Sequence, residues 1–179
     1  MPKFVALLRG VNVGGNRKLP MADLRDFFAE LGYGVAQTLL QSGNVVFAAT
    51  GSAAALEKKL EAEARRRLGL DTDFHVRSAD EWRGIVGGNP FAHAAAEDPA
   101  HLVVQVLRAA PSAAQLRALR DAITGRETVE VRGRHAYIVY PDGIGTSRLT
   151  AAVLDAKLGT HGTGRNWNTV LKLQALLGA

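Results

Sequence analysis

The segment of residues 3–31, KFVALLRGVNVGGNRKLPMADLRDFFAEL, contains the pattern from which the fold is predicted. It opens with Lys3–Leu8, a short apolar run that is typical of a buried strand. Gly10–Pro20 is rich in glycine and asparagine and is predicted to form a loop. The apolar residues of Met21–Leu31 recur with a helical period, and Gly32 ends the helix. The segment therefore predicts a strand, a long loop and a helix.

The residues that follow continue this alternation as far as residue 88. The predicted elements are strands at Val35–Leu40 and Asn44–Ala48 around the turn Gln41-Ser42-Gly43, a helix at Ser52–Leu68, a strand at Thr72–Val76, and a short helix opened by Ser78 with Glu81 as its capping-box partner. A strand–helix–strand–strand–helix–strand order is the ferredoxin-like arrangement, an antiparallel sheet with two helices on one face.

The same order recurs after Asn89–Pro99, a proline-containing segment that is predicted to be a linker. The predicted elements are a strand at His101–Leu107, a helix at Ser112–Ile123, a hairpin of Thr128–Arg132 with His135–Tyr140, a helix at Thr146–Leu158, a strand at Thr160–Arg165 and a helix at Trp167–Leu177. We therefore expect an α+β fold of two tandem ferredoxin-like units, residues 1–88 and 100–179. Each unit has an antiparallel sheet with helices packed on one face, followed by an extra helix.

Composition excludes several classes of protein. The chain has 179 residues, of which 47% are hydrophobic, so it can form a core. It has no cysteine, which excludes disulfides, thiolate nucleophiles, cysteine-ligated zinc and iron–sulfur clusters. No signal peptide and no run of about 20 apolar residues is present, so we expect a soluble cytoplasmic protein without membrane contacts. The five histidines lack metal-ligand spacing, and no metal site is expected.

The first twenty residues of the chain are basic. The formal net charge is +5, and the stretch from Met1 to Pro20 contains Lys3, Arg9, Arg17 and Lys18 without any acidic residue. Such a stretch suits an anionic ligand, because the ligand needs positive potential where it docks.

The loop Arg9–Pro20 is the first candidate site. Gly14-Gly15 allows consecutive backbone N–H groups to line an anion-binding nest, and the following helix adds partial positive charge at its N-terminus. The pattern is neither a P-loop nor a dinucleotide fingerprint. A loop whose glycines serve turns and whose arginines serve solubility is the alternative. The candidate ligand-binding residues here are Arg9, Asn12, Gly14, Gly15, Asn16, Arg17 and Lys18.

Three further segments could contribute to the same site. Gln41, Ser42 and Asn44 could direct polar groups toward it, although a hairpin turn also explains them. Tyr140–Leu149 is a second junction between a strand, a glycine loop and a helix, where Thr146 or Ser147 could cap the helix and Arg148 would lie in its first turn. A salt bridge elsewhere would also explain Arg148.

The last of these segments surrounds the start of the C-terminal helix. Arg165 adds charge, Asn166 or Asn168 could cap the helix, and Trp167 is either a stacking platform for a ring or a core residue. Across the four segments the sole carboxylate is Asp142, which a turn explains. General acid–base catalysis therefore has no evident group to perform it.

These features favour a protein that binds a phosphorylated or nucleotide-like anionic small molecule between the two units. The alternatives are a nucleic-acid-binding protein, an enzyme acting on an anionic substrate, and a scaffold or oligomerisation domain. Whether the protein is an enzyme stays open. The sequence identifies no cofactor and no oligomeric state.

Five motifs in the same order carry a resemblance to a known family. They are Leu7–Asn16, Gln41–Phe47, Asn89–Phe91, Tyr140–Gly145 and Arg165–Val170. Over residues 3–177 the chain resembles domain-of-unknown-function family 1697, which is largely bacterial. Thr146 stands where the family pattern has a basic residue, and Gly164 replaces a usual threonine. The resemblance implies an α+β fold with ferredoxin-like units, and it implies no activity, cofactor or catalytic residue.

Overall fold

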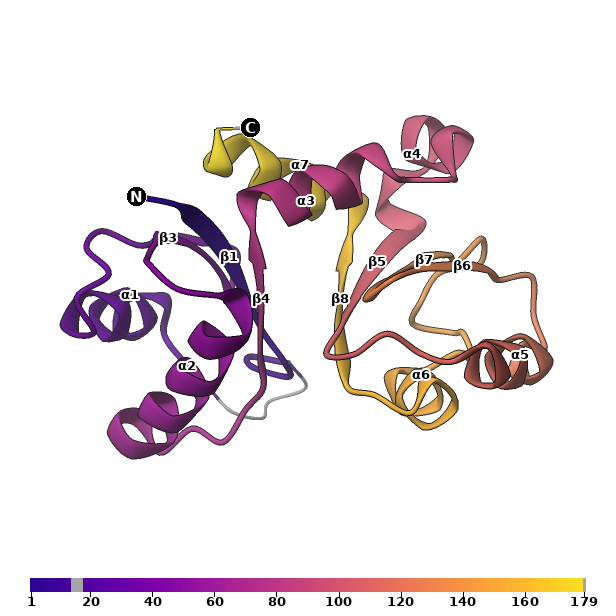
Figure 1. Ribbon diagram of the computed structural model, residues 1–179. Coiled ribbons are helices and arrows are strands. Elements are labelled where there is room, and N and C mark those ends of the chain that lie inside the picture. The colour runs from indigo at the N-terminus through magenta and orange to yellow at the C-terminus, as the bar shows by residue number, and fades with distance from the viewer. Residues whose placement is uncertain (14–17, 179) are drawn as a thin grey trace. The chain divides into compact units, whose positions relative to one another are not determined.

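The computed structural model describes residues 1–13 and 18–178 of the chain (Figure 1). The chain divides into two compact units. Unit 1 comprises Met1–Val86 together with the residues from Lys172 onward, and unit 2 comprises Gly87–Leu171. This division differs from the predicted boundaries, since it assigns most of the C-terminal helix to unit 1 and the segment predicted as a linker to unit 2.

Unit 1 has the strand order of a ferredoxin-like fold. Its sheet is β2-β3-β1-β4, and β1 pairs antiparallel with both β3 and β4. The elements are β1 (Lys3–Leu8), α1 (Met21–Glu30), β2 (Gln37–Leu39), β3 (Asn44–Ala48), α2 (Ala53–Leu68), β4 (Phe74–Ser78) and α3 (Ala79–Gly87). The predicted fold class is confirmed for this unit.

The core of unit 1 lies between the sheet and its two long helices. Phe4, Ala6 and Leu8 alternate along β1 and belong to one buried cluster with Phe28 of α1 and Leu60 of α2. This two-residue period places one face of the strand against the helices. Removing each large apolar side chain from water contributes about 1.5–3 kcal/mol. The apolar run that predicted the strand is therefore also what holds α1 and α2 on the sheet.

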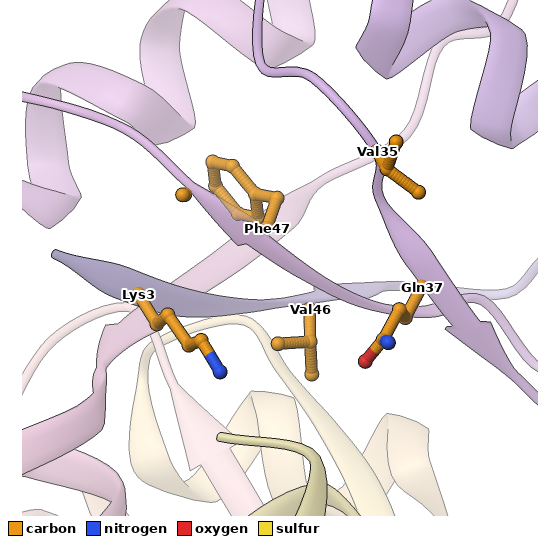
Figure 2. A pocket seen from close by; sticks show the side chains of 6 residues that line it. Lys3, Val35, Gln37, Val46 and Phe47 are labelled. Atoms are coloured by element: carbon orange, nitrogen blue, oxygen red, sulfur yellow. The ribbon is translucent and has the colours of Figure 1, made fainter. Parts of the chain in front are cut away.

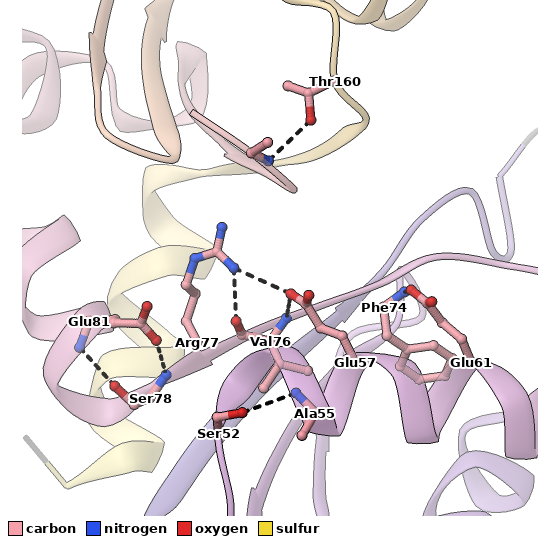
Figure 3. Close-up of polar contacts among 11 residues, drawn as sticks. Ser52, Ala55, Glu57, Glu61, Phe74, Val76, Arg77, Ser78, Glu81 and Thr160 are labelled. Atoms are coloured by element: carbon pink, nitrogen blue, oxygen red, sulfur yellow. Dashed lines mark hydrogen bonds and ion pairs between the residues drawn. The ribbon is translucent and has the colours of Figure 1, made fainter. Parts of the chain in front are cut away.

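Helix α2 also closes the outer edge of β4, as Figure 3 shows. Glu57 and Glu61 lie one helical turn apart and accept the backbone N–H groups of Val76 at 2.9 Å and Phe74 at 3.0 Å. The guanidinium of Arg77 lies 3.5 Å from the same Glu57 carboxylate, and both side chains are buried. Because an unpaired strand edge is a template for another chain, these contacts protect β4 from such pairing.

Unit 2 repeats the same topology, with the sheet order β6-β7-β5-β8 and all pairs antiparallel. Its elements are α4 (Ala92–Glu97), the 3₁₀ helix η1 (Pro99–His101), β5 (Leu102–Leu107), α5 (Ala113–Ala122), β6 (Thr128–Arg132), β7 (His135–Val139), α6 (Ala151–Leu158), β8 (Gly162–Asn166) and the first part of α7 (Trp167–Leu177). The fourth strand of this unit, which the sequence indicated only faintly, is present as β8.

Two segments differ from the sequence prediction. Asn89–Pro99 is not a plain linker, because Ala92–Glu97 forms α4. Its alanines favour a helix, and the prolines of the segment flank that helix rather than interrupt it. Helix α6 begins at Ala151 instead of Thr146, since Thr150 is the N-cap and accepts the N–H of Val153 at 3.3 Å.

Other helix ends follow the sequence signals. Ser52 caps α2 by accepting the N–H of Ala55 at 3.2 Å. Ser78 and Glu81 form the predicted capping box, with bonds of 2.8 Å and 3.2 Å (Figure 3). No helix in the described part of the chain is both long enough and apolar enough to cross a membrane.

The turn between β2 and β3 generates a stability prediction at Gly43. Its φ is +82°, and a Cβ there would lie 2.8 Å from Leu8 Cβ and from Val11 Cγ2. Gly43→Ala combines left-handed strain of about 1–2 kcal/mol with an overpacking cost of about 1–3 kcal/mol. We expect urea unfolding to show a loss of about 2–5 kcal/mol.

Gly133 supplies the matched control for this substitution. It has a φ of +58°, but a Cβ there would meet no atom within 4 Å. Gly133→Ala should therefore cost only the strain, about 1–2 kcal/mol. Equal losses for the two variants would contradict the close packing of the turn at Gly43.

Candidate functional site

One side chain joins the β1–α1 loop to the β2–β3 turn in unit 1. Asn12 Nδ2 donates to the carbonyls of Leu19 at 2.8 Å and Gln41 at 2.7 Å. Asn12 Oδ1 accepts the N–H of Leu19 at 2.8 Å. Asn12 has a φ of 55°, a left-handed conformation that asparagine tolerates better than most residues. We call Asn12, Leu19 and Gln41 the loop clamp, because Asn12 links Leu19, near the end of the loop, to the turn.

The Gln41–Asn44 turn is itself packed against the end of β1. The carbonyl of Gly43 accepts the N–H of Leu8 at 2.9 Å. The amide of Asn44, which is fully buried, donates to the carbonyl of Leu39 at 2.7 Å and to Ser42 Oγ at 3.0 Å. These contacts support the interpretation of Asn44 as a turn residue. The side chain of Gln41 stays exposed, and Ser42 is half-buried.

The described cations of the first loop differ in exposure. Lys18 is exposed, and no carboxylate of the described residues forms an ion pair with it. Arg9 is half-buried, and its backbone is held by Asp73 and Thr72 of the segment before β4. The fold therefore brings one acidic residue, Asp73, beside a stretch that has none of its own. Gly14, Gly15, Asn16 and Arg17 lie outside the described residues.

The second junction contains more negative charge than the sequence indicated. Ser147 Oγ donates to Glu127 Oε1 at 2.5 Å and accepts the N–H of Leu149 at 3.0 Å, so it does not cap α6. Arg126 pairs with Asp142, and this hydrogen bond holds the pKa of the Asp142 carboxyl below its usual value. Arg148 is exposed and lies before α6, so its prediction as a first-turn residue is wrong.

Two of the predicted site residues around the start of α7 are buried, and a third caps the helix. Arg165 is 8% exposed and donates from Nη1 to Thr163 Oγ1 at 2.7 Å and to the Gly164 carbonyl at 2.8 Å. Burial lowers the pKa of Arg165 to about 10. Asn166 caps α7 by accepting the N–H of Thr169 at 3.0 Å. Trp167 is 5% exposed, which favours its interpretation as a core residue.

Asn168, the last of the predicted site residues, is exposed on the first turn of α7. In unit 1 the structure brings Asn12, Gln41, Ser42 and Asn44 together at the β2–β3 turn. The expectation that these residues and those of unit 2 form one site stays a prediction.

Arg165 has a counterpart in unit 1 that the sequence did not reveal. Arg77 pairs with Val5, the third residue of β1, and Arg165 pairs with Val104, the third residue of β5. Each guanidinium donates from Nη1 to the carbonyl of the preceding residue at 2.8 Å. Each arginine is followed by a residue that caps the next helix. An arginine before a capping residue is the one signal in the sequence that marks this repeat.

A contact between Asp98 and His101 is also not predicted from the sequence. Asp98 Oδ2 lies 2.7 Å from His101 Nδ1, and both side chains are partly exposed. Their spacing of three residues on adjoining turns is the signal that could have found the pair. Within residues 1–13 and 18–178, no group of three or more metal-ligating side chains gathers in one place.

A small pocket lies on the β1–β3 side of unit 1, away from the loop clamp. Its volume is about 140 Å³, and it is lined by Lys3, Val35, Gln37, Val46, Phe47 and Ala48. Figure 2 shows the side chains of Lys3, Val46 and Gln37 extending to the same side of the strands. Lys3 Nζ donates to the carbonyl of Leu176 at 3.5 Å. Ligand sites usually measure about 300–1,000 Å³, so this pocket is too small for a nucleotide.

Comparison with known proteins identifies the family and the fold. The chain belongs to the family described as "Protein of unknown function (DUF1697)", whose model matches residues 1–137. The fold is also similar to the solved structure of a conserved bacterial protein from Streptococcus pneumoniae. The two share 23% sequence identity with a TM-score of 0.77, over 98% of each chain. No curated protein matches this chain.

The loop clamp generates a second stability prediction. Asn12→Gly removes all three hydrogen bonds but tolerates the positive φ, so we expect a loss of about 2–4 kcal/mol at about 1 kcal/mol per bond. Asn12→Ala adds left-handed strain of about 1–2 kcal/mol. Urea unfolding of both variants measures the losses. If Asn12→Ala were as stable as Asn12→Gly, the strain at Asn12 would be refuted.

Tyr140 generates a prediction about alkaline pH. Its buried hydroxyl donates to the Leu149 carbonyl at 3.1 Å, and burial, followed by the charge of Glu127, raises the pKa of Tyr140 to about 12. The pKa of tyrosine in an unfolded chain is about 10. The contribution of Tyr140 to stability is therefore fully present below about pH 10 and is lost as the pH rises toward 12.

Tyr140→Phe tests this contribution. The free energy of unfolding of the wild type should fall more steeply between pH 9 and pH 11 than that of the variant. Urea unfolding at the two pH values measures the difference. Parallel losses in the two proteins would show that Tyr140 ionises as readily in the folded chain as in the unfolded one.

Proposed function

We propose that the β1–α1 loop and the β2–β3 turn of unit 1 bind a phosphorylated or nucleotide-like anionic small molecule. The observation that carries this proposal is the loop clamp. The side chain of Asn12 makes three hydrogen bonds, to Leu19 and to Gln41, so its role is to hold these two residues together. Residues that are held in place before a ligand arrives lose less entropy on binding.

The groups near the clamp suit phosphate oxygens. Lys18 directly precedes the clamped Leu19 and presents an exposed ammonium group. Gln41 and Ser42 supply an amide and a hydroxyl from the turn, and Arg17 adds a further cation in the sequence of the loop. Hydrogen bonds from charged donors to phosphate are roughly twice as strong as neutral ones. Lys18, Gln41 and Ser42 therefore place a cation and two polar side chains at or beside the clamped residues.

The second junction supports the proposal less well. Glu127 and Asp142 lie among its donors, and a carboxylate repels an anionic ligand. The side chains of Arg165 and Trp167 are both buried inside the protein. Arg148 is the remaining exposed cation of the predicted set in unit 2.

A nucleic-acid-binding function is less well supported. RNA-binding proteins of this topology stack bases on aromatic side chains at the open face of the sheet. Phe4, the aromatic residue of β1, instead belongs to the cluster that packs against α1 and α2. Strand β5 contains no aromatic residue.

A ligand panel tests the proposal. Nucleotides, sugar phosphates and inorganic phosphate are titrated by calorimetry and thermal shift at low and high salt. We expect binding that weakens with salt, and a roughly tenfold or greater loss of affinity in Lys18→Ala, since a charge-assisted hydrogen bond contributes about 1.5–3 kcal/mol. Asn12→Gly should also weaken binding, because it removes the clamp.

Arg117→Ala is the matched control, because it removes an exposed arginine on α5 of unit 2. It should leave binding unchanged. Arg148→Ala then decides whether the second junction contributes. A flat response of the wild type to the whole panel would overturn the proposal.

A further inference from the structure

The outer edge of β6 in unit 2 is built differently from the strand edges of unit 1. β4 has its outward N–H groups bound by Glu57 and Glu61, and β2 has only three residues. β6 is a regular strand of five residues that contains no proline. It lies at the end of its sheet and pairs only with β7 among the described residues. An open strand edge of this kind is a template for pairing with another strand.

The hairpin geometry shows which backbone groups of β6 face outward. Arg132 pairs with His135 across the two-residue turn Gly133-Arg134. In a two-residue hairpin the residues beside the turn exchange both backbone hydrogen bonds, and such pairs alternate along the ladder. The N–H and C=O groups of Arg132 and Glu130 therefore point to β7. Those of Val131 and Val129 point away from the sheet.

The side chains of β6 divide between two faces. Val129 belongs to the core cluster of unit 2, and Val131 packs against that cluster. Thr128, Glu130 and Arg132 are exposed and share the opposite face. Arg132 Nη1 donates to the carbonyl of Gly88, which leaves further guanidinium N–H groups for a carboxylate. The open edge thus presents an acidic and a basic side chain two residues apart.

We propose that two copies of this chain pair antiparallel through the edges of their β6 strands, with the twofold axis at Val131. In that register the two Val131 residues exchange both backbone hydrogen bonds. Glu130 of each copy lies opposite Arg132 of the other, which gives two ion pairs across the axis. Cross-strand pairs of opposite charge stabilise a sheet, and like charges directly opposite destabilise it.

Charge selects this register over its neighbours. An axis at Glu130 would place the two Glu130 carboxylates directly opposite each other. An axis at Val129 would pair Glu130 with Thr128 and leave Arg132 without an acidic partner in the other copy. The axis at Val131 is the one that satisfies both charges and uses outward-facing backbone groups. The result is an isologous interface, in which the same patch serves both copies.

The first test is the association state of the full chain. Sedimentation velocity over a range of concentrations should show a monomer–dimer equilibrium that weakens with salt. Val131→Pro removes an outward N–H but no bond of the hairpin, and it should sediment as a monomer. A wild type that is monomeric at all concentrations, or a dimer that survives in Val131→Pro, would overturn the proposal.

Charge reversals on the exposed face test the register without touching the core. Glu130→Arg and Arg132→Glu should each weaken the dimer at least tenfold, because each places like charges opposite one another. The double variant Glu130→Arg/Arg132→Glu should recover most of the lost affinity. Arg117→Glu, an equal charge reversal on α5, should leave association unchanged. A double variant as weak as the single ones would refute the register at Val131.

Discussion

Each unit depends on a central strand that is paired on both edges. β1 pairs with β3 and β4, and β5 pairs with β7 and β8, in every case antiparallel. Both strands are almost entirely buried, since Val5–Leu8 and Leu102–Leu107 are at most 6% exposed. A one-residue shift would move every side chain of such a strand to the other face. The central strand therefore sets the register of its neighbours and the place where its connecting loop begins.

The candidate site follows from that register. β1 ends at Leu8, whose N–H is bound by Gly43 of the β2–β3 turn. The loop that leaves β1 consequently passes beside the turn, and Asn12 reaches the Gln41 carbonyl at 2.7 Å. Glycine at position 43 is needed because the turn approaches Leu8 and Val11 too closely for a Cβ. The polar motifs that stood apart in the sequence thus meet for reasons of packing, and the side chain of Gln41 stays exposed.

The two units share a topology but differ in where their charged side chains lie and what they contact. Arg77 and Arg165 occupy equivalent positions, yet Arg77 lies 3.5 Å from Glu57, a carboxylate supplied by the helix beside its strand. The same glutamate and Glu61 close the edge of β4, so one helix face both neutralises a buried cation and protects a strand. The charged side chains of β6, Glu130 and Arg132, are exposed. This contrast is why we propose self-association through the edge of β6 and not through the edge of β4.

Local signals in the sequence determined most of the elements and several of their ends. The period of Lys3–Leu8, the caps at Ser52, Ser78 and Asn166, and the hairpin around Gly133 are interactions within a few residues, so a linear pattern can report them. The same local signals did not predict α4, because prolines near its ends outweighed its alanines. They also placed the start of α6 too early, because Thr146, Ser147 and Thr150 could each have served as the cap.

The tertiary structure alone decided which side chains meet. Glu127 lies twenty residues before Ser147 in the chain and hydrogen-bonds to it only because β6, β7 and the following loop fold together. The burial of Trp167 and Arg165 and the clamp formed by Asn12 likewise depend on strands paired across long sequence separations. The sequence therefore located the polar loops and turns of this protein. The pairing of the strands decided which side chains of these loops and turns form contacts within the protein and which face outward.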